Sequence, residues 1–146
     1  QGLVAEVAVP VEGRKHRYLH LLHPLGPLCA ELRERGYRIY LETSGTSPLS
    51  GDFDWICVSP KKHCPPLREV LAKADELKVV IGESTDTEWA ESVRKSVGAG
   101  CVLMMQPEWG RRQSASRLIV EYVKAHPEWR ISLQTHNTST FHNTNQ

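Results

Sequence analysis

Residues 77–105 read LKVVI-GESTDTEWAESVRKSVGAG-CVLMM, and this stretch decides the fold. Its two ends, residues 77–81 and 101–105, are short apolar runs of the kind that form strands covered on both faces. Between them, residues 85–97 place apolar side chains at helical spacing, and Gly98 and Gly100 close the helix. A strand, a helix and a second strand in this order predict a right-handed β-α-β unit with parallel strands.

The same alternation continues on both sides of this unit. Helices are predicted at 27–35, 67–74, 85–97 and 113–125, and strands at 37–43, 55–59, 77–81, 101–105 and 129–134. Pro27 and Gly36 frame the first helix, and Pro127 limits the last one, because proline cannot continue a helix. The pattern predicts an α/β fold, a parallel sheet of alternating helices and strands. Five strands do not close an eight-stranded barrel, so the sheet is open or is part of a barrel.

The two ends of the chain differ from this pattern. Residues 1–24 show no clear periodicity and are predicted to be an irregular segment. Residues 137–146 are polar and of low complexity, and are predicted to be disordered because they cannot bury enough apolar surface. The α/β domain is therefore expected to span residues 25–136.

Composition excludes several classes of function. The formal net charge is +1, which does not indicate binding to nucleic acid or to an anionic membrane. No run of eighteen apolar residues and no signal-peptide pattern is present, so a cytoplasmic location is expected. Cys29, Cys57 and Cys101 lie in a helix or in apolar runs and are interpreted as buried thiols, whereas Cys64 is expected to be more exposed. No spacing of these cysteines predicts a metal site.

Polar side chains follow four of the predicted strands. They occupy residues 42–46, 59–62, 106–109 and 134–136. Ligands of parallel sheets collect at the carboxyl ends of the strands, so these residues are expected to share one rim. Each segment also has a structural interpretation: Glu42 pairs locally, Ser59-Pro60 and Gln106-Pro107 end strands, and His136 is a surface histidine.

Such a rim suits a zwitterionic, nucleoside-like ligand. Carboxylate and hydroxyl groups bind ribose and amino donors, and a lysine binds a carboxylate. Trp109 offers a stacking face, or packs against the neighbouring helix. No nucleophile–base pair is present, so no catalytic residue is predicted, and the chemistry of such a site would need a cofactor.

Five segments carry a resemblance to a known family. They resemble, in order, its E-T-N-G-T, D-W-I-x-V-S-P-K, A-D-E-L-K, L-Q-P and P-x-W-R-L-S-L-Q-T-H motifs, and they lie at residues 42–46, 54–61, 74–78, 103–107 and 127–136. Serine replaces asparagine at Ser44. Residues 21–136 thereby resemble the C-terminal two-thirds of a 7-carboxy-7-deazaguanine synthase, a radical S-adenosylmethionine enzyme.

The resemblance implies a shortened (β/α) barrel that works as a homodimer. It implies conversion of 6-carboxy-5,6,7,8-tetrahydropterin to 7-carboxy-7-deazaguanine, a step of queuosine and deazapurine biosynthesis, with S-adenosylmethionine, a [4Fe-4S] cluster and magnesium. By the same resemblance, the S-adenosylmethionine site is formed by Ser59, Pro60, Lys61, Gln106, Pro107, Glu108 and Trp109. Glu42 and His136 would bind the pterin.

The sequence also departs from the family. The C-x3-C-x2-C motif that holds the cluster is absent, as are the adjoining magnesium-binding threonine and the T-G-G-E-P segment. We therefore expect the chain to be truncated and inactive by itself, with no metal ligands. Residues 137–142 become the family's Lys-Tyr-Ile-Asp-Ile-Pro ending when one base is restored, so the tail is interpreted as frameshifted.

Two other functions stay open at this point. The chain is a cluster-free, non-catalytic relative or pseudogene product that acts as a binding or partner subunit, or it is a different radical enzyme such as a glycyl-radical activase. The ending at residues 129–136 argues against the activase.

Overall fold

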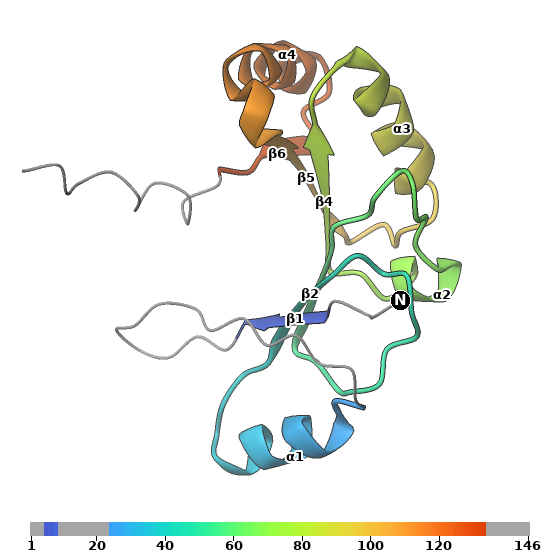
Figure 1. Cartoon of the computed structure of the whole chain (residues 1–146), viewed down its shortest axis with the longest axis vertical. Coiled ribbons are helices and arrows are strands. Elements are labelled where there is room, and N and C mark those ends of the chain that lie inside the picture. The colour runs from blue at the N-terminus through green and yellow to red at the C-terminus, as the bar shows by residue number, and fades with distance from the viewer. Residues whose placement is uncertain (1–4, 9–23, 134–146) are drawn as a thin grey trace, which may run out of the picture.

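A six-stranded sheet contains the five parallel strands that the alternating pattern predicted (Figure 1). The computed structural model describes residues 5–8 and 24–133. The elements are β1 (Ala5–Ala8), α1 (Gly26–Glu34), β2 (Tyr40–Thr43), β3 (Trp55–Val58), α2 (Arg68–Leu71), β4 (Glu76–Ile81), α3 (Ser84–Arg94), β5 (Val102–Pro107), the 3-10 helix η1 (Trp109–Arg111), α4 (Arg112–Ala125) and β6 (Trp129–Ile131). No helix in these residues is long and apolar enough to cross a membrane.

The order of the strands in the sheet follows their order in the chain. Strands β2 to β6 lie side by side and parallel, without the reversal that marks a doubly wound sheet. A sheet wound in one direction carries its crossover helices on a single face. This arrangement agrees with part of a (β/α) barrel and leaves the other face, here called the inner face, without crossover helices.

One strand was not predicted from the sequence. Strand β1 pairs antiparallel with β2, with Ala5 opposite Thr43 and Ala8 opposite Tyr40, so the interpretation of residues 1–24 as wholly irregular is wrong at this point. Four residues are too few to establish a period, and the strand is fixed by its pairing with β2. The rest of that segment, except Pro24, and residues 134–146 lie outside the described residues.

Several predicted elements are shorter in the structure: helix α3 ends at Arg94 instead of 97, and strand β6 ends at Ile131 instead of 134. Strand β2 begins at Tyr40, because the Tyr37 amide still bonds the Leu32 carbonyl at the end of α1. Helix α2 ends at Leu71, because the chain must turn before the Asp75 amide bonds the Ile56 carbonyl and continues the sheet. The other four parallel strands and helices α1, α3 and α4 begin close to their predicted starts.

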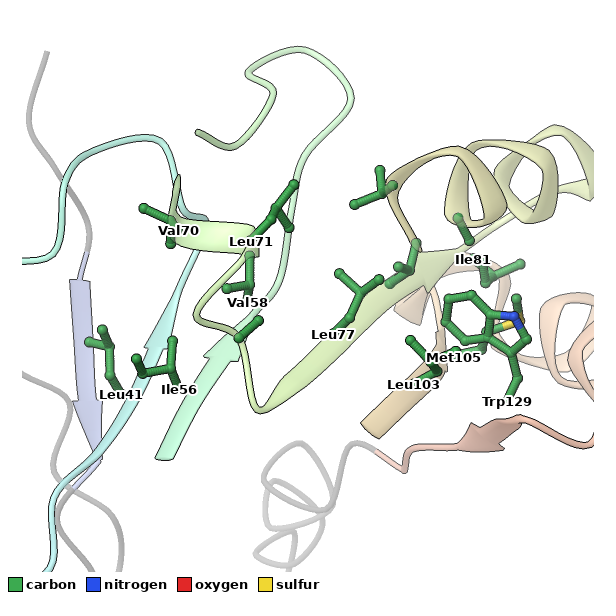
Figure 2. Packing of buried hydrophobic residues seen from close by; sticks show 14 of the residues in the cluster. Leu41, Ile56, Val58, Val70, Leu71, Leu77, Ile81, Leu103, Met105 and Trp129 are labelled. Atoms are coloured by element: carbon green, nitrogen blue, oxygen red, sulfur yellow. The ribbon is translucent and has the colours of Figure 1, made fainter. Parts of the chain in front are cut away.

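The core lies between the sheet and the helices, where Figure 2 shows its buried side chains. Strand β4 alternates buried and half-buried positions, so only one of its faces is fully covered, unlike the two-sided burial predicted for it. The strands contribute Leu41, Ile56, Val58, Leu77, Val79, Ile81, Leu103, Met105 and Trp129 to the core. Burying a side chain of this size stabilises the fold by about 1.5–3 kcal/mol.

Helix α3 begins with a capping box at the end of β4. The amides of Gly82 and Glu83 donate to Oδ2 of Asp86 at 2.7 and 2.9 Å, and the Glu83 side chain accepts in return. The ammonium group of Lys62 forms an ion pair with Asp86. These contacts fix the chain where β4 leaves the sheet.

Glu91 joins α3 to α4 and β6. Its Oε1 accepts from the Tyr122 hydroxyl at 2.9 Å and from Nε1 of Trp129 at 2.6 Å. Arg94 lies 3.3 Å from its other oxygen. Burial alone would raise the pKa of Glu91, but these three donors hold it below its ordinary value. Burial and the bond to Glu91 raise the pKa of Tyr122 to about 12.

We predict that the contribution of Glu91 to stability disappears in acid. Its folded-state pKa lies below the ordinary value of 4.5. The stabilisation is therefore complete above pH 4.5 and is lost as pH falls through the folded pKa. Glu91→Gln should lower the free energy of unfolding by about 1–2 kcal/mol at pH 7, and the difference from wild type should narrow towards pH 3. Urea unfolding at several pH values measures it, and a difference that stays constant with pH would contradict the prediction.

Candidate functional site

The carboxyl ends of the parallel strands meet at one edge of the sheet, as predicted. Hydrogen bonds between neighbouring strands continue past the strand ends into the loops. The amides of Ser59, Glu108 and Ser132 bond the carbonyls of Thr43, Ile81 and Met105 at 2.7, 2.8 and 2.8 Å. These bonds tie three of the four predicted polar segments to this edge, here called the rim.

Glycine is required in the first of these segments. Gly45 has a φ of 76°, in the left-handed region, and a Cβ built on it would lie 2.9 Å from Cβ of Pro66 and 3.1 Å from Cγ1 of Val58. The amide of Gly45 donates to Oγ1 of Thr43 at 3.1 Å, and its carbonyl accepts from the Leu67 amide at 2.8 Å. The turn after β2 is therefore held in one conformation.

The second segment places a lysine beside a serine at the end of β3. Nζ of Lys61 donates to Oγ of Ser59 at 3.3 Å. Ser59 and Pro60 are buried, whereas Lys61 is exposed. A hydroxyl and an exposed ammonium group side by side suit a ligand carboxylate.

The third segment follows β5 and divides into buried and exposed residues. Gln106 and Pro107 are buried, whereas Trp109 is 42% exposed. The Glu108 side chain accepts from the Gly110 amide at 3.1 Å and so caps η1. The guanidinium carbon of Arg112 lies 5.0 Å from the Trp109 ring centre.

A pocket of about 570 Å³ opens beside this segment. It is lined by Pro107, Trp109, Arg112, Gln113, Ser116 and Leu133. An exposed indole and several polar side chains around a concave surface are typical of a site for a planar, polar ligand.

Glu42 lies on the inner face and pairs with a residue that the sequence analysis did not select. Nζ of Lys78, on β4, lies 2.5 Å from Oε1 of Glu42, on β2. The Lys78 side chain is 15% exposed and that of Glu42 is 35% exposed, so the carboxylate is the more accessible partner.

Two further polar groups lie beside this pair. Cys57 and Glu76 stand in register with each other, and Cys57 with Glu42, so all three share the inner face. The Cys57 thiol donates to Oε1 of Glu76 at 3.4 Å, and burial raises the pKa of that thiol. Burial would lower the pKa of Lys78, but Cys57, Glu42 and Glu76 raise it overall. Lys78 is therefore protonated at neutral pH.

A sequence signal for Lys78 was present. It is a charged residue inside an apolar strand, at a position that alternates with the core residues Leu77 and Val79. The side chain of such a residue lies on the face of the sheet away from the core, and its charge needs a partner of opposite sign there. Arg112 carried no comparable signal, because an arginine at the start of a helix is ordinary. Gln134 and His136 lie outside the described residues.

The cysteines are placed largely as expected. Cys29 and Cys57 are buried, Cys101 is half-buried with its pKa raised by burial to about 11, and Cys64 is exposed. Within residues 5–8 and 24–133, no group of three histidine, cysteine or acidic residues is placed to bind a metal ion. These residues therefore do not fit an iron–sulfur cluster or magnesium.

The comparisons with known proteins agree with one another. The chain is 43% identical over 116 residues to the 7-carboxy-7-deazaguanine synthase of Synechocystis, which covers 80% of this chain and 55% of that protein. It is 37% identical to the same enzyme of Burkholderia multivorans, over 92% of this chain and 65% of that protein. The crystal structure of QueE from Escherichia coli matches with a TM-score of 0.69 and 31% identity, over 80% of this chain and 53% of that chain. No family model matches.

Each match covers a larger share of this chain than of the relative. The Flavobacterium psychrophilum synthase, 39% identical, matches 75% of this chain and 52% of its own length. The chain thus spans about half the length of most of the curated relatives described here, and up to 65% of one of them.

Proposed function

Because this chain is homologous to part of the 7-carboxy-7-deazaguanine synthases, we propose that it forms the part of such an enzyme that binds S-adenosylmethionine and a carboxylated pterin. The enzyme would convert 6-carboxy-5,6,7,8-tetrahydropterin to 7-carboxy-7-deazaguanine. The observation that carries the proposal is the assembly of polar groups from β2, β3, β4 and β5 on one rim and one face of the sheet.

S-adenosylmethionine fits the rim by its chemistry. Its amino acid part carries a carboxylate, which the Ser59 hydroxyl and the Lys61 ammonium group would bind. Its adenine would lie against Trp109 in the pocket beside Pro107. Gln106 would add a further contact to S-adenosylmethionine, as the resemblance implies. Glu108 would act by fixing the turn that presents Trp109. When bound, S-adenosylmethionine is the source of the radical in this enzyme family.

The pterin fits the inner face. The amino-pyrimidinone edge of a pterin presents adjacent N–H donors, and the accessible Glu42 carboxylate can accept from them. His136 would add a second contact to the same substrate, as the resemblance implies. In this arrangement, the chain binds and orients the two ligands, and its own residues move no proton.

We predict that the chain binds S-adenosylmethionine through Ser59 and Lys61. The double variant Ser59→Ala/Lys61→Ala should weaken the affinity at least about 10-fold, because it removes one neutral and one charged hydrogen bond. Equilibrium dialysis of the full chain with labelled S-adenosylmethionine measures this change. Lys73→Ala is the matched control, because Lys73 is exposed and precedes the amino end of β4, away from the rim. Equal losses in both variants, or no binding by the wild type, would contradict the proposal.

A second candidate is a partner subunit without radical chemistry. The four cysteines stand at positions 29, 57, 64 and 101, and none has the spacing of a cluster motif. Iron content after anaerobic reconstitution distinguishes the candidates: about four irons per chain support a synthase that acts by itself, and a value near zero supports the partner role. We also propose a homodimer, as the resemblance implies, which sedimentation equilibrium tests.

A further inference from the structure

Lys78 is a half-buried charge of the inner face that the proposed ligand contacts do not use. Its neighbours are Glu42 on β2, Cys57 on β3 and Glu76 on its own strand. Burying a lysine is unfavourable unless its charge is paired, so this position calls for a reason beyond packing.

The geometry of the ion pair suggests what Lys78 does. Nζ lies 2.5 Å from Oε1 of Glu42, and neither a hydrogen bond nor an ion pair engages Oε2 among the described residues. Lys78 lies deeper than Glu42, since their side chains are 15% and 35% exposed. The pair thus holds one oxygen of the carboxylate, while the Glu42 side chain as a whole stays partly accessible.

The neighbours of Lys78 indicate which carboxylate its ammonium group binds. Glu76 already accepts the Cys57 thiol at 3.4 Å, and its register places it beside Cys57, with β3 between it and β2. Glu42 is therefore the carboxylate that the ammonium group holds directly. A glutamate side chain has three rotatable bonds, and fixing it before the ligand arrives lowers the entropic cost of binding.

We propose that Lys78 is a positioning residue that orients Glu42 for the amino-pyrimidinone edge of the pterin. This inference rests on the proposed function, because it needs Glu42 to bind the pterin. Lys78 touches neither ligand; it acts through Oε1, so that Oε2 accepts the ligand N–H.

A double-mutant cycle on the full chain tests the role. Binding of 6-carboxypterin is measured by isothermal titration for wild type, Lys78→Met, Glu42→Gln and the double variant. Lys78→Met should weaken binding about 10-fold when Glu42 is present, and less than about 2-fold in the Glu42→Gln background. Lys78→Arg should restore most of the affinity, and binding of S-adenosylmethionine should be unchanged in all variants.

The alternatives give other results. If Lys78→Met lowers the affinity for 6-carboxypterin equally in both backgrounds, or does not lower it, the positioning role is overturned. Binding of 6-carboxypterin by the wild type would still uphold the proposed function. No binding by the wild type would overturn both. If Lys78→Met shows no cooperative thermal transition, Lys78→Gln replaces it in the cycle. The double variant contains no unpaired carboxylate at residue 42, and so separates loss of folding from loss of positioning.

Discussion

Replacing Trp129 by alanine lowers the free energy of unfolding by about 4 kcal/mol, the largest effect expected of a single change in this chain. Trp129 is 1% exposed, in register with Leu103 at the edge strand β6. Its ring closes the core at this end of the sheet (Figure 2), and its Nε1 donates to Glu91 at 2.6 Å. Alanine would leave a cavity and remove one donor from a half-buried carboxylate.

Trp129→Phe is the matched control for this prediction. Phenylalanine fills most of the space but lacks the N–H, so we expect a loss of about 1–2 kcal/mol. Urea unfolding followed by circular dichroism measures both variants. A loss below 1 kcal/mol for Trp129→Ala would show that β6 does not close the core.

Replacing Gly45 by alanine lowers the free energy of unfolding by about 3 kcal/mol. Two causes add: the left-handed backbone costs an alanine about 1–2 kcal/mol, and the new Cβ presses on Pro66 and Val58. Because Gly45 follows the end of β2, where Glu42 lies, the same change should disturb the site.

Gly36 separates these two causes. Its φ is 78°, but a Cβ there would meet nothing within 4 Å, so Gly36→Ala should cost only the conformational term of about 1–2 kcal/mol. Thermal unfolding of both variants gives the comparison. Equal losses would contradict the crowding around Gly45.

The sequence predicted the parallel sheet because helix and strand periods alternate strongly from residue 25 onward. It did not predict β1, since four residues carry no measurable period and the pairing with β2 depends on residues distant in the chain. The ends of α2 and β2 were wrong for a related reason: hydrogen bonds to other elements, such as Asp75 to Ile56, decide where each one stops.

The sequence predicted which residues of the candidate site lie at the rim, but it did not predict which side chains bind one another. Ser59, Lys61 and Trp109 lie at the rim because each follows a strand, and strand ends can be read from the sequence. The bond between Glu42 and Lys78 links β2 to β4 across β3, and no local pattern reports such a contact. The role of Glu108 as a cap also depends on the turn that follows it.

Hydrogen exchange of the full chain, with and without S-adenosylmethionine and 6-carboxypterin, tests the proposed site most directly. The account predicts slower exchange at residues 42–46, 59–61 and 106–112 when both ligands are present, because ligands at the rim block local opening there. Residues 98–101, which precede β5 at the opposite end of the sheet, should not change. Protection confined to that opposite end, or no protection at saturating ligand, would contradict a binding site at the rim.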